Sequence, residues 1–76
     1  MMVTVFIAVG VKDKKLYAVS PLMDFPFIAT KTDIYSVRVS DEVADEVREM
    51  MLLAKREEAF KLLKRVSQSF THVGNQ

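Results

Sequence analysis

The residue types that most often carry out catalysis are scarce in this chain of 76 residues. It has one histidine, His72, it has no cysteine, and its only glycines are Gly10 and Gly74. Without cysteine there is no disulfide or thiol chemistry, and two separated glycines do not make a phosphate-binding loop. His72 lies in a terminal segment that we expect to fray, so it would not be held against a substrate. We therefore predict a protein that is not an enzyme and binds no cofactor.

Three carboxylates, Glu42, Glu46 and Glu49, are spaced so that they share one face of a helix. Such a face can hold a divalent cation loosely, but the same spacing is routine on a solvated helix. No histidine or cysteine joins the group. We predict no metal site.

Basic side chains indicate a possible contact with nucleic acid, because lysine and arginine neutralise phosphates and release counterions. The candidate residues are Arg38, Lys55, Arg56, Lys61, Lys64 and Arg65. Lys12, Lys14 and Lys15 would extend this group, although lysines in a turn more often only keep it soluble. The net charge of +1 argues against a bulk attraction to nucleic acid or to an anionic membrane. Nucleic-acid binding is therefore the alternative function and not the first.

The segment from Tyr35 to Val43 has a strand-then-helix outline similar to that of ribbon-helix-helix DNA-binding proteins. The resemblance implies that Ser36 and Arg38 point outward, where alternate side chains of the strand read bases. The chain departs from that pattern in two ways. It has no glycine-marked turn between helices, and more than thirty residues precede the strand.

The elements that must position these residues begin with strands. Residues 2–11 alternate on two largely apolar faces, which is typical of a central strand. Residues 12–15 form a polar turn, and residues 16–20 form the returning strand, which Pro21 ends. A further strand lies somewhere within residues 27–39.

The connection over residues 21–27 is unusually apolar for a loop. It either folds over an open side of the sheet and closes the core, or it recognises a partner. In the second case, its contact residues would be Leu22, Met23, Phe25 and Phe27.

A helix is predicted from Ser40, a good N-cap residue, to about Phe70. Its apolar stripe changes face near Lys55, which allows three structures: one continuous helix, a kink that folds the second half back over the core, or an antiparallel helical dimer. The usual helix breakers, glycine, proline and asparagine, are missing from this segment. We therefore favour one unbroken or gently bent helix.

The charge of the helix also changes along its length, since residues 41–50 are mostly acidic and residues 55–65 mostly basic. An antiparallel pair of such helices would place each acidic half beside a basic half. We expect a homo-oligomer, with a dimer as the first form, that self-associates through Leu52, Phe60, Leu63, Val66 and Phe70.

Together these patterns predict one α+β domain over residues 1–76. It has a β-rich part over 1–39, a helix over 40–70 and a frayed tail over 71–76. The small three-stranded, mostly antiparallel sheet is followed by one long C-terminal helix. The predicted function is a small non-enzymatic protein-interaction module that associates with itself or with another protein. No segment is apolar for long enough to span a bilayer, so we expect a cytoplasmic protein without a membrane partner.

Overall fold

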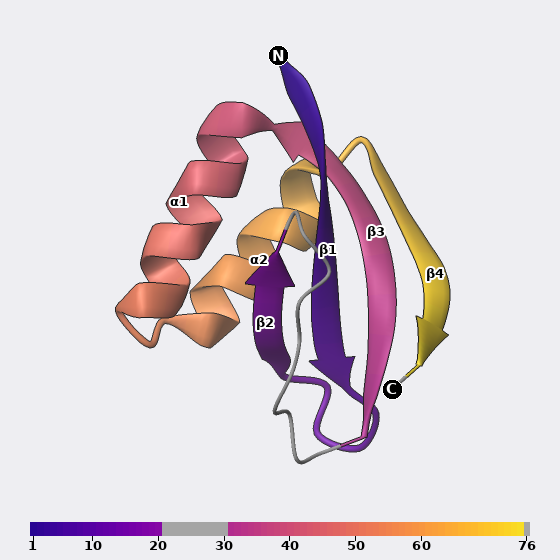
Figure 1. The fold of residues 1–76 in the computed structure, drawn as a ribbon. Helices are drawn as coiled ribbons and strands as arrows, with labels where there is room; N and C mark the ends of the chain where they lie inside the picture. The colour runs from indigo at the N-terminus through magenta and orange to yellow at the C-terminus, as the bar shows by residue number, and fades with distance from the viewer. Residues whose placement is uncertain (21–30, 76) are drawn as a thin grey trace.

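The structure, a computed structural model, describes residues 1–20 and 31–75. Strands β1 (Met2–Gly10), β2 (Leu16–Ser20), β3 (Thr32–Ser40) and β4 (Ser69–Asn75) form one antiparallel sheet in the order β2-β1-β3-β4. Helices α1 (Asp41–Leu52) and α2 (Arg56–Val66) lie together on one face of that sheet (Figure 1). The architecture is α+β, with a layer of helices on a layer of strands.

The expected three-stranded sheet with one long helix is wrong. The segment from Ser40 to Phe70 contains two helices instead of one, and a fourth strand follows them. That strand, β4, occupies most of the tail that was expected to fray, because it pairs with β3 from Asp33 to Arg38. The predicted hairpin of β1 and β2 and the helix start at Ser40 are confirmed. The Ser40 hydroxyl accepts a hydrogen bond from the Val43 N–H at 3.2 Å.

The helical segment is broken by a left-handed C-terminal cap that uses alanine where glycine is usual. Ala54 has φ of 60°, its N–H donates to the Met51 carbonyl (3.1 Å), and the Lys55 N–H donates to the Met50 carbonyl (2.8 Å). This pair of bonds is the Schellman motif that ends many helices. Because the residue in the left-handed position has a side chain, the sequence carries no ordinary signal of the break.

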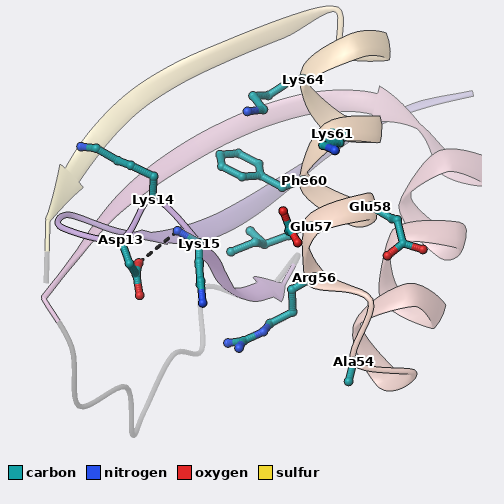
Figure 2. Close-up of a pocket in the computed structure, with 11 residues that line it drawn as sticks. Asp13, Lys14, Lys15, Ala54, Arg56, Glu57, Glu58, Phe60, Lys61 and Lys64 are labelled. Carbon is teal, nitrogen blue, oxygen red and sulfur yellow. Dashed lines mark hydrogen bonds between the residues drawn. The ribbon is translucent and has the colours of Figure 1, made fainter.

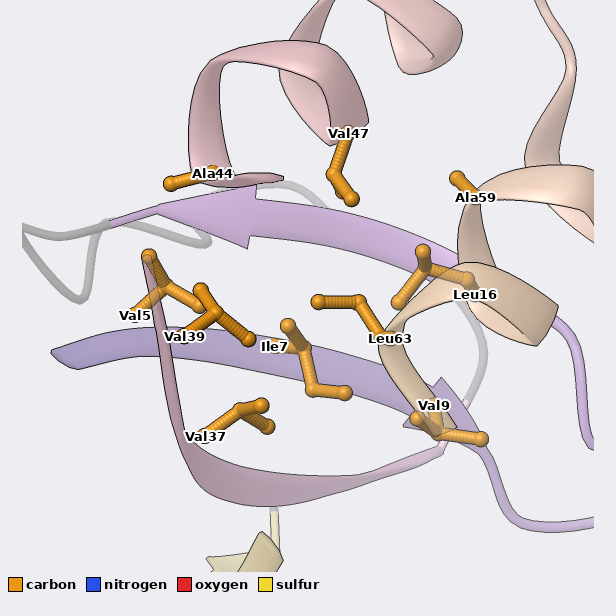
Figure 3. Packing of buried hydrophobic residues seen from close by; sticks show 10 residues of the cluster. All are labelled: Val5, Ile7, Val9, Leu16, Val37, Val39, Ala44, Val47, Ala59 and Leu63. Carbon is orange, nitrogen blue, oxygen red and sulfur yellow. The ribbon is translucent and has the colours of Figure 1, made fainter. Parts of the chain in front are cut away.

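The core explains why the chain tolerates that strained turn. Its strand residues are Val5, Ile7, Val9, Leu16, Val37 and Val39, and its helix residues are Ala44, Val47, Ala59 and Leu63 (Figure 3). The two apolar stripes that face different directions on a straight helix thus meet the same side of the sheet once the helix is folded back. Burying both stripes offsets the cost of the corner.

The opposite face of the sheet is also partly apolar. Ala8 and Ile34 are buried there, with Phe6 and Ala18 packed against them. This agrees with the two apolar faces expected for the first strand. The connection with Leu22, Met23, Phe25 and Phe27 lies outside the described residues.

Candidate functional site: a basic cleft

The first wall of the cleft is the turn between β1 and β2. The Gly10 N–H donates to the Lys15 carbonyl (2.8 Å), the Lys14 N–H donates to the Gly10 carbonyl (3.1 Å), and Lys14 has φ of 60°. Asp13 fixes the turn, since its carboxylate accepts hydrogen bonds from the Lys15 N–H (3.0 Å) and the Tyr17 hydroxyl. The bond from Tyr17, followed by the one from Lys15, lowers the pKa of Asp13 below its ordinary value. These hydrogen bonds hold the backbone of the turn that carries Lys14 and Lys15.

The second wall is α2, which turns Ala59 and Leu63 into the core and keeps its basic residues at the surface. Two of these cations lie over aromatic rings. The Arg56 guanidinium carbon is 5.5 Å from the centre of the Tyr17 ring, and the Lys64 Nζ is 4.3 Å from the centre of the Phe60 ring. Such contacts hold a cation at the surface without neutralising it.

Between these walls lies an open cleft of about 370 Å³ (Figure 2). Its lining is formed by Asp13, Lys14, Lys15, Leu16, Ala54, Arg56, Glu57, Glu58, Phe60, Lys61 and Lys64. Five of these side chains are cationic and three are carboxylic acids, so the cleft has a net positive charge. The volume falls in the range of ordinary ligand sites.

The positive charge is not cancelled by contact. Among the described residues, the ion pairs join the N-terminal amine to Asp41 and Arg48 to Asp45, His72 contacts Asp33, and none of these contacts involves a cation of the cleft. Of the three carboxylates, Asp13 is engaged within its own turn, and Glu57 and Glu58 occupy the first turn of α2, where the helix dipole favours negative charge.

The fold gathers only some of the basic residues that the sequence suggested for nucleic-acid contact. Arg56, Lys61 and Lys64 line the cleft, whereas Lys55 and Arg65 are exposed outside its lining. Arg38 pairs with Thr4, on the face of the sheet opposite the helices, and its Nε donates to the Gln68 Oε1 at 3.2 Å.

The sequence reasoning gave the turn lysines only a supporting role, and the cleft makes them half of the site. These lysines lie some forty residues before α2 in the chain, so the sequence alone does not show that they line the same cleft as α2.

The resemblance to ribbon-helix-helix proteins is limited by the sheet, since β3 has β1 on one side and β4 on the other. It therefore has no open edge with which to form a two-chain ribbon.

The residues suggested for self-association fall into two groups. Leu63 is completely buried, and Phe60 and Phe70 are half-buried against the core, so this part of the stripe is used within the chain. Leu52 and Val66 remain 87% and 42% exposed.

The part of the chain that is described, residues 1–20 and 31–75, has no group of three histidine or carboxylate side chains placed to hold a metal ion. Glu42, Glu46 and Glu49 all lie at the exposed surface of α1.

His72 Nε2 is 3.1 Å from Asp33 Oδ1 and its ring contacts Tyr35 edge-on, so it is part of the sheet rather than of the cleft. Neither helix has the length and apolar character needed to cross a membrane.

Comparisons of this chain with protein families, curated proteins and solved structures find no match. The geometry of the cleft is therefore the basis for a functional proposal.

Proposed function

We propose that this protein is a small, non-enzymatic binding module and that its basic cleft holds the phosphate backbone of a nucleic acid. The observation that carries the proposal is the convergence of Lys14 and Lys15 with Arg56, Lys61 and Lys64 from a segment some forty residues away. Gathering like charges destabilises a folded protein, so an anionic ligand would relieve their mutual repulsion.

The shape of the cleft favours a single strand over a duplex. From Arg56 to Lys64 the helix advances by about 12 Å, and Lys14 and Lys15 belong to the turn that forms the other wall. A groove with cations on both walls follows one backbone, as in proteins that bind single strands without sequence preference. A cleft of about 370 Å³ is too small to enclose a double helix.

The test is binding of a short fluorescent oligothymidine, measured by anisotropy at several salt concentrations. The double variant Lys61→Gln with Lys64→Gln should bind about tenfold more weakly at low salt, and its log–log salt slope should be shallower by about 1.4, as expected for two lost phosphate contacts on a single strand. The matched control is Lys55→Gln with Arg65→Gln, which removes the same charge from outside the cleft.

The control should change affinity by less than about threefold, because its residues do not line the site. Equal losses in both double variants would show attraction to bulk charge and not to the cleft. An absence of binding by the unchanged protein at low salt, to single strand and duplex alike, would end the proposal.

Self-association is the second function that we propose, and the helices offer one of two competing interfaces for it. What favours it is the exposed corner between α1 and α2, where Leu52 and Leu53 are 87% and 60% exposed. The substitution Leu52→Glu should lower the molecular mass in solution if this corner joins two chains. A mass that stays unchanged would exclude the corner as the interface.

A further inference from the structure

The sheet ends on one side in β4, and no described strand lies beyond it (Figure 1). An edge strand presents a row of backbone N–H and C=O groups without a partner in the sheet, and such a row is a template for another strand. Proteins usually block it with lysine, proline or a bulge.

The two edges of this sheet differ in how well they are blocked. At β2, Pro21 follows the strand in the sequence, and the basic cleft begins at the first residue of the strand, Leu16. Two copies that met along β2 would bring two positively charged clefts together, which is unfavourable.

β4 has none of the charged residues or prolines that protect an edge. Its seven residues, Ser69–Asn75, include no lysine, arginine, aspartate, glutamate or proline. The register shift opposite Ile34 and Tyr35 leaves Val73 as a bulge, so the regular part of the strand runs from Ser69 to His72. Two copies could meet along this part without repulsion between like charges.

Aromatic side chains beside this edge supply an apolar contact. The Phe70 ring lies 4.9 Å from the Tyr35 ring and 6.4 Å from the Phe60 ring of α2, and the His72 ring lies 5.3 Å from Tyr35. The group is therefore on the helix side of the sheet. Phe70 is only half-buried and His72 is exposed in the single chain.

We propose that β4 pairs antiparallel with β4 of a second copy of this chain, about a twofold axis near Thr71. Such an axis is perpendicular to the sheet, so the helices of both copies lie on the same face. Phe70 and His72 of the two copies then meet between the helix layers and cover one another. The interface is isologous, as in most small symmetric dimers. The inference does not depend on the proposed nucleic-acid site.

The test is molecular mass by light scattering behind size exclusion, over a range of concentrations, with the variant Thr71→Lys. Thr71 is exposed and pairs with Ser36, on the face opposite the helices, so a lysine there leaves the core unchanged. The unchanged protein should reach twice its chain mass of 8.7 kDa, and Thr71→Lys should remain at 8.7 kDa. The control Thr71→Val has nearly the same volume and no charge, and it should still dimerise.

Circular dichroism must show that Thr71→Lys is folded; should it unfold, Ser69→Lys, at the start of the same exposed edge, takes its place. A single-chain mass for the unchanged protein at every concentration would overturn the proposal. So would a dimer that survives both lysine substitutions, or one that Leu52→Glu disrupts while Thr71→Lys does not. The last result would assign the interface to the helical corner.

Discussion

Ala54 and Lys14 are the two described residues other than glycine with a positive φ, and both line the basic cleft. A left-handed conformation costs an ordinary residue of order 1 kcal/mol, and such residues are often found at functional sites. Here they form the two corners that bring the turn lysines and α2 to the same opening. The shape of the cleft thus depends on backbone conformations that most side chains disfavour.

Replacing Ala54 with glycine should stabilise the protein by about 1 kcal/mol, because glycine adopts a positive φ without the clash of a Cβ atom. Urea unfolding followed by circular dichroism measures the change. Ala44→Gly is the control, since Ala44 is buried in α1 and glycine there should destabilise by at least about 1 kcal/mol. A loss of stability in Ala54→Gly would contradict the assigned strain.

The two glycines should respond differently to alanine. A Cβ atom on Gly10 would lie 2.1 Å from the Asp13 Oδ1 and 2.8 Å from the Tyr17 ring, whereas one on Gly74 meets nothing within 4 Å. Gly10→Ala should therefore destabilise by about 1–3 kcal/mol, as overpacking does, and Gly74→Ala should be neutral or slightly stabilising. Thermal unfolding of the two variants compares them directly. Equal effects would show that the β1–β2 turn is looser than described.

The lowered pKa of Asp13 predicts how the turn responds to acid. A carboxyl whose pKa is lower in the folded state stabilises the fold above its unfolded value, which is near 3.8, and loses that contribution as the pH falls through the folded value. Asp13→Asn should therefore be less stable than the unchanged protein at neutral pH, and the gap should narrow below pH 3.8. The midpoint of urea unfolding, measured against pH for both proteins, tests this. A gap that stays constant with pH would contradict it.

At the scale of elements, the pair of helices explains why the apolar stripe of the helical segment changes face near Lys55. Each helix supplies one small and one larger residue to the buried core, Ala44 and Val47 from α1 and Ala59 and Leu63 from α2. A single straight helix would leave one of these pairs facing solvent. The corner at Ala54 is what allows both to be buried.

Because of this arrangement, the leucines of the helical segment should contribute very different amounts to the stability of the fold. Leu63→Ala should cost about 2–5 kcal/mol, the range for a large-to-small change at a buried site, since Leu63 is 0% exposed. Leu52→Ala should change stability by less than about 0.5 kcal/mol, because Leu52 is 87% exposed. Chemical denaturation at low protein concentration, where any dimer is dissociated, measures both. A similar cost at both positions would indicate one long helix.

At the scale of the whole molecule, local patterns in the sequence predicted local structure. Alternation located β1 and β2, and Ser40 marked the start of α1, because these signals need only a few neighbouring residues. A break near Ala54 was one of three structures that the sequence allowed, but one unbroken helix was favoured because no glycine marks the break. β4 was missed because its pairing with β3 and the contact of Phe70 with Tyr35 exist only after the chain has folded.

The candidate site could be predicted only in part for the same reason. Arg56, Lys61 and Lys64 stand close together in the sequence and were recognised as a basic group. Nothing in the sequence shows that the turn with Lys14 and Lys15 lies against α2, since that contact depends on the order of strands and on the helical corner. Lys55 and Arg65 belong to the same run of residues but lie outside the cleft.

The placement of acidic α1 beside basic α2 has a consequence for how a ligand arrives. The net charge of +1 gives the protein almost no pull on a distant polyanion, but α1 and α2 carry charge of opposite sign and so give the protein a dipole. If the cleft binds a nucleic-acid strand as proposed, α1 repels the approaching strand and the cleft attracts it, so the field acts mainly as a torque that turns the protein. Added salt should therefore slow association by impairing orientation, even before it weakens the contacts in the cleft.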